Sequence, residues 1–330
     1  MVKDLIKLCE GREIYIQTHN FPDPDAIASA YGLKQLLNCF NIKSILCYEG
    51  KIDKLSTSKM LQTFGIEMFS YDEIKEVMKE ADPIICVDSQ KHAGNITDFI
   101  GDEIACIDHH PTFVEVEYQY KDIRMAGACS SLIAGYYKEL KIEPDENTAT
   151  ALLYGLKMDT SQFTRGVTSL DIEMFDYLFV RSNHEAISML EHNVMEFGDL
   201  KAYGAAIENI QVYDKFGFTV IPFPCPDSLI ATLADFILAL NEVDVVVVGS
   251  KRKDGLKLSV RSEVAEVHAG YLVRDALIDI GNGGGHATMA GGFVSKEMLG
   301  EIGDYYDNAI RQRFSAELEK TGYFQIQENS

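Results

Sequence analysis

The residues best suited to chemistry lie between Gln17 and Ala26, a segment with one imidazole and two carboxylates. His19, Asp23 and Asp25 are spaced four and then two residues apart. In an extended loop, side chains two residues apart point the same way, so the two carboxylates would converge. An imidazole with two carboxylates suits a divalent transition ion such as manganese or iron. The same residues are also compatible with a helix N-cap at Asp25, with His19 as a turn residue.

The flanking sequence predicts the elements that position this segment. A short apolar run at 14–16 precedes it, and residues 26–37 have helical spacing after it. Further apolar runs at 44–48, 83–87 and 104–107 are too short for helices, and helical patterns separate them. Strands of this kind alternating with helices are typical of a doubly wound, mainly parallel sheet with both faces covered. Ligands bind such sheets beyond the carboxyl ends of the strands.

Acidic residues and histidines follow several of these apolar runs. The set is His19, Asp23 and Asp25, then Asp88, then Asp108, His109 and His110, and finally Asp159, which we count with the strand ends. Four or more carboxylates in one pocket repel one another unless cations neutralise them. Two metal ions sharing a bridging carboxylate would use all these ligands, and paired metals recur in phosphoryl displacement. Each element alone could instead be a strand-end turn or a cap.

The second half of the chain predicts a smaller α/β domain with a mixed sheet. Strand runs at 244–249 and 256–262 flank an Asp-Gly turn, which indicates a hairpin. A helix at 267–280 leads into a glycine-rich loop at 281–286. The long, charged helical pattern before this half is expected to be a connector, although a plain surface helix would look similar. We expect domains at 1–185 and 211–330, joined by a helical connector at 186–210.

Composition limits the classes of partner and location. The chain has 330 residues and a net charge of -21. Such a surface repels long nucleic acid and anionic membrane, so a phosphate substrate must meet metal or a local positive site. Seven cysteines occur without a CxxC pair, no apolar run approaches about 18 residues, and the first residues carry charge too early for a signal peptide. We expect a cytoplasmic protein.

The ordered motifs resemble those of the DHH phosphoesterases. The matching residues are His19-x-x-x-Asp23-x-Asp25, then Asp88, then Asp108-His109-His110, and then Asp159-Thr160. Arg261-Ser262 followed by Gly283-Gly284-Gly285-His286 resembles the C-terminal DHH-associated domain of that family. The length and the two-domain layout are similar to the nano-RNase and pAp phosphatase branch, which has exopolyphosphatase-related relatives.

The resemblance implies a role for each residue. Two Mn²⁺ ions are expected, with Mg²⁺, Co²⁺ or Fe²⁺ as substitutes. His19 and Asp23 would hold one ion, and Asp25 and His109 would hold the other. Asp88 would bridge the two ions, and Asp159 would complete the site. His110 would contact the scissile phosphate, and Asp108 would orient a ligand imidazole. Arg261, Ser262, Gly283, Gly284, Gly285 and His286 would bind a substrate phosphate.

Departures from the family pattern bear on the substrate. Pro24 replaces a usual Gly, Ala28 stands where a Gly-Ser pair is common, and the segments after Asp88 and His286 are less basic than in many relatives. We expect hydrolysis of short oligonucleotides or of pAp, which would give AMP and phosphate. The alternatives are exopolyphosphatase or cyclic-dinucleotide phosphodiesterase activity and, from another class, a non-catalytic metal or nucleotide sensor. Homodimerisation is left open.

Overall fold

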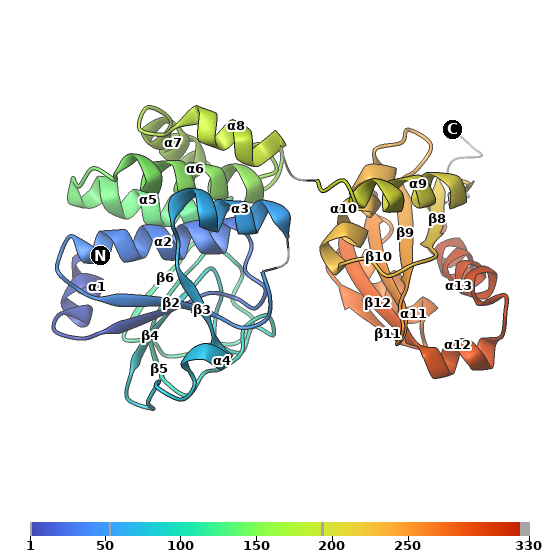
Figure 1. The fold of residues 1–330 in the computed structure, drawn as a ribbon, viewed down its shortest axis with the longest axis horizontal. Coiled ribbons are helices and arrows are strands. Elements are labelled where there is room, and N and C mark those ends of the chain that lie inside the picture. The colour runs from blue at the N-terminus through green and yellow to red at the C-terminus, as the bar shows by residue number, and fades with distance from the viewer. Residues whose placement is uncertain (1, 53, 193–194, 324–330) are drawn as a thin grey trace. The chain divides into compact units, whose positions relative to one another are not determined.

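The computed structural model describes residues 2–52, 54–192 and 195–323. The chain divides into two compact units, Met1–Val194 and Met195–Ser330 (Figure 1). The segment expected to be a connector is shared between them. Helix α8 (His184–His192) buries Ile187 and Leu190 in the core of the first unit. Helix α9 (Asp199–Asn209) buries Ala202 and Ala206 in a core of the second unit, and residues 193–194 lie outside the described residues.

A six-stranded, fully parallel sheet forms the centre of the first unit, in the order β3-β2-β1-β4-β5-β6. Its strands are β1 (Ile14–Gln17), β2 (Ser44–Tyr48), β3 (Met68–Ser70), β4 (Pro83–Val87), β5 (Asp102–Asp108) and β6 (Tyr120–Ile123). The predicted parallel sheet is confirmed. The strand order reverses between the adjacent strands β1 and β4, and sheets of this kind bind ligands at that switch point.

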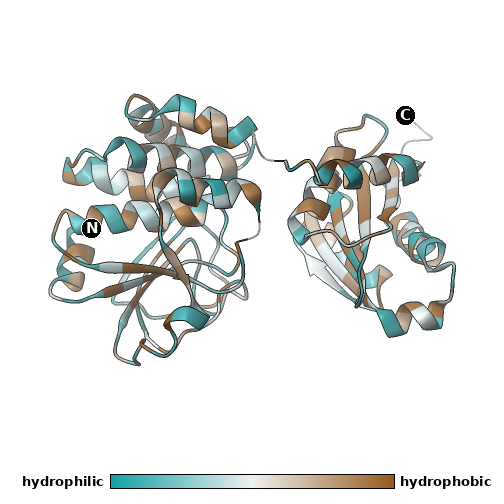
Figure 2. Ribbon diagram, viewed as in Figure 1, coloured by the Kyte–Doolittle hydropathy of each residue, from teal (hydrophilic) through white to brown (hydrophobic). Residues whose placement is uncertain are grey.

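Helices cover the two faces of this sheet unequally. One core is shared by α1 (Val2–Cys9), α2 (Pro24–Asn38), α3 (Leu55–Phe64), α5 (Cys129–Leu140), α6 (Glu146–Asp159), α7 (Ser169–Phe179) and α8. The opposite face carries a smaller core around Cys86 and Phe99, together with the short helix α4 (Tyr71–Ile74). In Figure 2 the sheet strands carry hydrophobic residues, while the helices carry both kinds.

The second unit contains a mixed sheet in the order β11-β12-β10-β9-β8-β7. Its strands are β7 (Gln211–Tyr213), β8 (Phe216–Ile221), β9 (Val245–Lys251), β10 (Gly255–Ser262), β11 (Asn282–Gly285) and β12 (Met289–Ser295). Strands β8 and β9 are parallel and the other pairs are antiparallel, and the predicted β9–β10 hairpin is confirmed. Alternate side chains of a strand point to opposite faces, so Val245 and Val247 enter one core and Val246 and Val248 the other.

Helices cover both faces of this second sheet. Helices α9 and α10 (Asp227–Leu238) lie on one face, and α11 (Ala269–Ala276), α12 (Lys296–Ile302) and α13 (Tyr306–Lys320) lie on the other (Figure 1). The prediction of a glycine-rich loop at 281–286 is wrong for most of its length. Gly283, Gly284 and Gly285 belong to edge strand β11, because their backbones pair antiparallel with β12.

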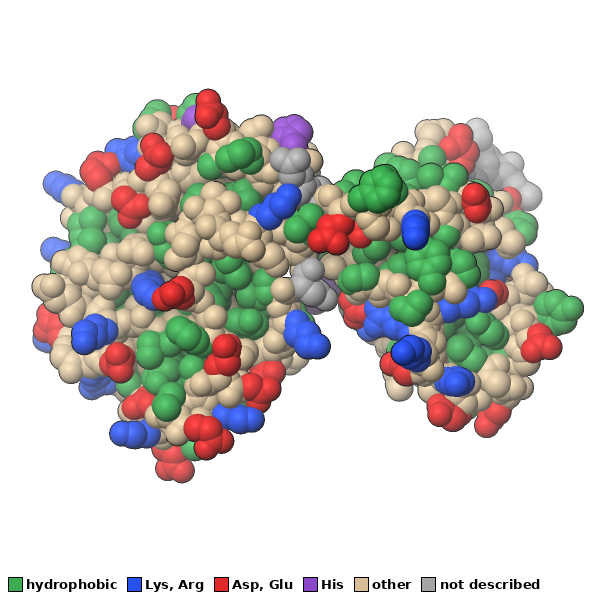
Figure 3. Space-filling view, viewed as in Figure 1, with side chains coloured by type: hydrophobic (Ala, Val, Ile, Leu, Met, Phe, Trp, Pro, Cys, Tyr) green, Lys and Arg blue, Asp and Glu red, His purple; other side chains and the backbone are tan. Residues whose placement is uncertain are grey.

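Acidic and basic side chains are interspersed on the faces of both units drawn in Figure 3. No described helix combines the length and the apolar character needed to cross a membrane.

Candidate metal and phosphate sites

The turn between β1 and α2 places His19 and Asp23 at the carboxyl end of the sheet. Neither the extended loop through Asp25 nor the alternative of an N-cap at Asp25 is found, because Asp25 already belongs to α2. Asp23 is the N-cap of α2, and its Oδ1 accepts hydrogen bonds from the amides of Asp25 and Ala26 at 3.0 and 3.1 Å. Pro24 occupies the first helical turn, where its missing N–H costs no hydrogen bond. Asp23 therefore both caps the helix and faces His19, with 3.8 Å between Oδ1 and Nε2.

Asp88 lies between two imidazoles. Its Oδ2 is 3.7 Å from Nε2 of His19, and its Oδ1 is 3.2 Å from Nε2 of His109. The residue follows β4, is buried, and has a φ of 59°. A non-glycine residue in this left-handed region is uncommon, and such strain is concentrated at functional sites. One carboxylate thus presents one oxygen to each histidine.

Backbone carbonyls orient both of these imidazoles. Nδ1 of His19 donates to the carbonyl of Asn20, and Nδ1 of His109 donates to that of Ala126, each at 2.9 Å. A carbonyl only accepts, so Nδ1 carries the hydrogen in both rings, and Nε2 is left to face the carboxylates. Metal-bound histidines commonly show this arrangement, in which the second nitrogen is held by an outer partner.

Asp25 and Asp159 approach His109 from helices α2 and α6. Nε2 of His109 is 3.4 Å from Oδ2 of Asp159. The Asp25 carboxylate accepts the amides of Cys129 and Ser130, at the first turn of α5, at 2.7 and 3.0 Å. Asp159 ends a helix, so counting it as a strand end is wrong.

Close packing of α2 against α6 makes this approach possible. Gly155 lies one helical turn before Asp159, and a Cβ at this position would be 2.8 Å from Cβ of Ala28 and 3.1 Å from Cα of Asp25. A larger residue would therefore push the two helices apart. Gly155 brings the Asp159 end of α6 next to Asp25.

His110 is held differently from the other two histidines. Its Nδ1 is 2.8 Å from Oδ1 of Asp108, and its side chain is 48% exposed. The sequence predicts that Asp108 orients a ligand imidazole. The imidazole that Asp108 contacts is that of His110, and its Oδ1 also accepts the backbone amide of His109 at 2.9 Å, whereas the His109 ring contacts Ala126. Gln90, which the sequence analysis missed, donates to Oδ2 of Asp108 at 2.7 Å. This buried chain of contacts aims an exposed imidazole at the site.

The charges of this cluster are unbalanced without a cation. Burial and the charge of Asp25 raise the pKa of Asp88 to about 7. Burial and the charge of Asp159 also raise the pKa of Asp25. Burial opposes charge on His109, but the Asp88 carboxylate 3.2 Å away outweighs it and raises the pKa of His109 to about 11. The same balance with Asp23 and Asp88 raises the pKa of His19 to about 10. Without a metal the centre therefore retains protons, on the imidazoles of His19 and His109 and, up to a pH of about 7, on Asp88.

These residues fit a pair of divalent cations. Potential ligand atoms gather within 4.8 Å of one another in three overlapping groups: His19, Asp23 and Asp88; Asp25, His109 and Asp159; and Asp88, Asp108, His109 and His110. Oδ1 of Asp88 and Nε2 of His109 are buried and lack a hydrogen-bond partner among the described residues. Buried polar atoms are rarely left unpaired, and a bound ion is one of the few explanations. Asp88 belongs to the first and third groups, and the third group shares His109 with the second.

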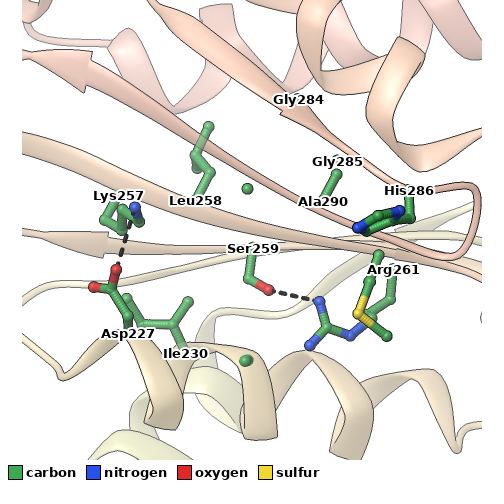
Figure 4. A pocket seen from close by; sticks show the side chains of 13 residues that line it. Asp227, Ile230, Lys257, Leu258, Ser259, Arg261, Gly284, Gly285, His286 and Ala290 are labelled. Carbon is green, nitrogen blue, oxygen red and sulfur yellow. Dashed lines mark hydrogen bonds and ion pairs between the residues drawn. The ribbon is translucent and has the colours of Figure 1, made fainter. Parts of the chain in front are cut away.

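The second unit contains a pocket of about 340 Å³ beside β10 and β11 (Figure 4). Of the predicted phosphate-binding residues, Arg261, Gly284, Gly285 and His286 line it. Ser262 and Gly283 do not. Ser262 is buried, and its hydroxyl donates to the carbonyl of Val264. Lys257, which the sequence analysis did not select, also lines the pocket and pairs with Asp227 at 3.2 Å.

Arg261 already has partners within the second unit. Its Nε donates to Oδ1 of Asp235 on α10 at 2.6 Å, and its Nη1 donates to the hydroxyl of Ser259 at 3.1 Å. Figure 4 shows its guanidinium beside Ser259, to which a dashed line joins it. The side chain is only 13% exposed. These contacts fix the guanidinium and occupy two of its three nitrogens.

Two features near the first site have no simple sequence signal. Arg165 donates to the carbonyl of Asp159 at 2.9 Å. Ser161, Gln162 and Phe163, between them, all have positive φ values of 48–66°. Three consecutive non-glycine residues with left-handed backbone conformations are energetically costly for L-amino acids. None of these positions is a glycine, so the sequence does not predict the turn. Only the folded chain places this strained turn beside the cluster.

Fold and site together define a two-domain α/β protein with a histidine–carboxylate centre at the switch point of its first sheet. Known families match both units. The model described as "DHH family, N-terminal domain" matches residues 13–156, and that described as "DHHA1 domain" matches residues 217–312. The first unit therefore contains a DHH-family N-terminal domain, and the second unit contains a DHHA1 domain.

Individual relatives are distant. The chain is 27% identical over 293 residues to an uncharacterized protein of Methanocaldococcus jannaschii, MJ1633, covering 88% of this chain and 60% of that protein. It is 24% identical to the cyclic-di-AMP phosphodiesterase GdpP of Geobacillus thermodenitrificans, covering 93% of this chain but 48% of GdpP. Thus it spans only about half to three fifths of these two relatives. It is 22% identical to the bifunctional oligoribonuclease and PAP phosphatase NrnA of Thermus thermophilus, covering 98% of this chain and 95% of NrnA.

A solved structure shares the fold over nearly the whole chain. It is an exopolyphosphatase-related protein from Bacteroides fragilis, with a TM-score of 0.77 and 19% identity, covering 98% of this chain and 97% of that one.

Proposed function

We propose that this protein is a manganese-dependent phosphoesterase with two metal ions, which hydrolyses short oligonucleotides, 3',5'-bisphosphorylated nucleosides such as pAp, or both. The carrying observation is the position of Asp88, whose two carboxylate oxygens face the separate imidazoles of His19 and His109. A shared carboxylate of this kind is what a two-metal phosphoryl-transfer site requires. Mixed imidazole and carboxylate ligands favour Mn²⁺ or a similar transition ion over Ca²⁺.

Each residue of the centre has a task in this proposal. His19 and Asp23 would hold one ion, Asp25, His109 and Asp159 would hold the other, and Asp88 would be shared between them. When bound, the ions supply a water acidic enough to attack phosphorus at neutral pH. His110 presents its free Nε2 to the phosphate, and the Asp108 hydrogen bond raises the pKa of His110 so that the ring stays a donor. A donor held in advance stabilises the charge that develops on the phosphate.

The second unit supplies recognition in this proposal. Arg261, His286 and the backbone of Gly284 and Gly285 face the same pocket and would hold a phosphate that does not react. The pocket of about 340 Å³ suits a group of nucleotide size, not a long strand. NrnA acts on oligoribonucleotides and PAP, and its length matches this chain most completely among the three relatives above.

Cyclic-dinucleotide phosphodiesterase activity is the alternative that a named relative, GdpP, favours. Exopolyphosphatase activity and a non-catalytic sensor are further alternatives, but a sensor has no need of a complete set of ligands for two ions.

One substrate panel separates these candidates. The metal-free protein is loaded with Mn²⁺ and assayed on a dinucleotide, a pentanucleotide, pAp, a cyclic dinucleotide and polyphosphate. We expect turnover of the linear nucleotides or pAp, and loss of that turnover with a chelator. Preferential turnover of the cyclic dinucleotide or of polyphosphate would replace the proposal by that alternative. No Mn²⁺-stimulated release from any of the five would support the sensor.

A further inference from the structure

Phe21 lies between two residues of the candidate metal centre and is 65% exposed. Consecutive Cα atoms are 3.8 Å apart, so its Cα is within about 7.6 Å of those of His19 and Asp23. Aromatic side chains of this size usually bury most of their surface. An exposed ring so close to a phosphoesterase centre therefore needs a reason.

The backbone holds Phe21 in an unfavourable conformation. Its φ is 55°, a left-handed value that is a genuine outlier for a bulky residue. Hydrogen bonds fix the strand-end segment on both sides. The amide of Phe21 donates to the carbonyl of Glu49 at 2.8 Å, and that of Asn20 donates to the carbonyl of Asn95 at 2.7 Å. Strain of this kind persists only where the surrounding structure imposes it, and it is concentrated at ligand sites.

Gly50 packs directly against the ring of Phe21. A Cβ at Gly50 would lie 2.7 Å from both Cδ1 and Cε1 of Phe21, so only glycine leaves room for the ring at this place. Gly50 itself has a φ of 95°, which other residues rarely adopt. The ring therefore rests against bare backbone, while most of its remaining surface is open. This is the geometry of a flat platform held in a fixed orientation.

We propose that Phe21 positions the substrate by stacking on a nucleobase of the nucleotide whose phosphate is cleaved at the histidine–carboxylate centre. The inference rests on the proposed function and deepens it, because a polyphosphate chain has no ring to stack. Every base has a π face, so an aromatic side chain can stack on any of the four bases. Phe21 thus accounts for binding of nucleotides without selecting among them.

The test compares Phe21→Ala, Phe21→Trp and wild type on a dinucleotide and on its two abasic forms, each of which lacks one base. Phe40→Ala is the matched control. Phe40 is also an exposed aromatic residue of this unit, but it follows the far end of α2, a 15-residue helix that is about 22 Å long. Melting temperature and bound Mn²⁺ are measured for each variant.

We expect Phe21→Ala to lower kcat/KM on the intact dinucleotide by about tenfold to a hundredfold, mostly through KM. Removing the stacked base from the substrate should cost wild type a similar factor and cost Phe21→Ala almost nothing further. Phe21→Trp should keep wild-type kinetics, since it keeps a π face. Phe40→Ala should change neither kinetics nor metal content.

Equal losses for Phe21→Ala on the intact dinucleotide and on both abasic forms would overturn the proposal. So would unchanged kinetics on all three. If wild type with Mn²⁺ turns over neither these dinucleotides nor pAp, the proposed function fails instead. Equilibrium binding of the same dinucleotides to wild type and Phe21→Ala then decides the stacking by itself: equal affinity rejects it, and a base-dependent difference upholds it.

Discussion

Nε2 of His109 and Oδ1 of Asp88 face each other at 3.2 Å in the interior of the first unit, and neither has a hydrogen-bond partner among the described residues. Two buried polar atoms at this distance leave each other's charge only partly compensated. A cation bound to both would replace that weak contact by two strong ones, and the proton that otherwise neutralises the pair would leave. This pair is therefore the natural place to test the metal centre.

Asp88→Asn should remove the bridging charge while it keeps the shape and tolerates the left-handed backbone at this position. We expect bound Mn²⁺ to fall and kcat to drop by more than about a hundredfold. That factor is the upper range for losing a mere outer partner of a metal ligand. Metal analysis and turnover on the best substrate measure both effects. Full metal content with normal turnover would contradict the bridging role.

The same variant gives a pH-dependent stability in metal-free protein. The pKa of Asp88 is raised from 3.8 to about 7 in the folded chain. The folded state binds this proton more tightly than the unfolded state, so protonation of Asp88 stabilises the fold. This stabilisation is fully present below pH 3.8 and is lost as the pH rises through 7. Asparagine mimics the protonated carboxyl. Metal-free Asp88→Asn should therefore be more stable than metal-free wild type at pH 8 and equal to it near pH 4. Urea denaturation in chelator at both pH values measures this, and equal stability at pH 8 would refute the charge imbalance.

Asp108→Asn should act on His110 without emptying the metal site. The hydrogen bond that His110 donates to Asp108 is the largest cause of the raised pKa of His110. Without that carboxylate the pKa of His110 should move back toward its ordinary value, so the protonated donor is lost at a lower pH. We expect the alkaline limb of kcat/KM to shift to lower pH, with a loss of about tenfold or more at pH 8. A pH profile beside a metal analysis checks this. An unmoved limb with lower metal content would instead make Asp108 a support of the metal ligands.

Arg261→Ala removes a charged donor whose hydrogen bond is worth roughly 1.5–3 kcal/mol. On a substrate with a second phosphate we expect kcat/KM to fall by about tenfold to a hundredfold, mainly through KM, with bound Mn²⁺ unchanged. A substrate with one phosphate is the control and should be affected less. Asp235→Ala should have a smaller effect of the same sign, because Arg261 keeps its Ser259 contact. Unchanged kinetics in Arg261→Ala would mean that Arg261 only forms an ion pair with Asp235 and does not bind substrate.

Substrate length should be limited to about two to five nucleotides, because a chain with a net charge of -21 offers little for a long polyanion. Up to about four phosphate contacts on a single strand give a slope of log affinity against log salt no steeper than about -3. Assays of a length series at three salt concentrations measure both. Rapid digestion of strands of about a hundred nucleotides with a steeper slope would contradict the expectation.

Much of the first unit can be read from the order of residues. Continuous apolar runs predict β1, β2, β4 and β5, because a strand buried on both faces leaves no place for polar residues. Parallel strands bring their carboxyl ends to one edge, so His19, Asp88 and Asp108 are expected together before any coordinates are known. Strand β6, Tyr120-Lys121-Asp122-Ile123, has no such run. It is a strand through its parallel pairing with β5, which the local sequence does not indicate.

Tertiary packing decided what local pattern could not. Asp159 meets His109 only because Gly155 lets α6 approach α2. Gly155 and Asp25, which pack together there, are more than a hundred positions apart in the sequence. The imidazole that Asp108 contacts is that of His110, because the carbonyl of Ala126 already holds the ring of His109. Gly283, Gly284 and Gly285 form a strand because β12 supplies the hydrogen bonds that glycine's own propensity does not favour. The sequence by itself determined which side chains could do chemistry and at which edge of the sheet. Only the folded chain determined which atoms face one another, since those distances depend on contacts between distant segments.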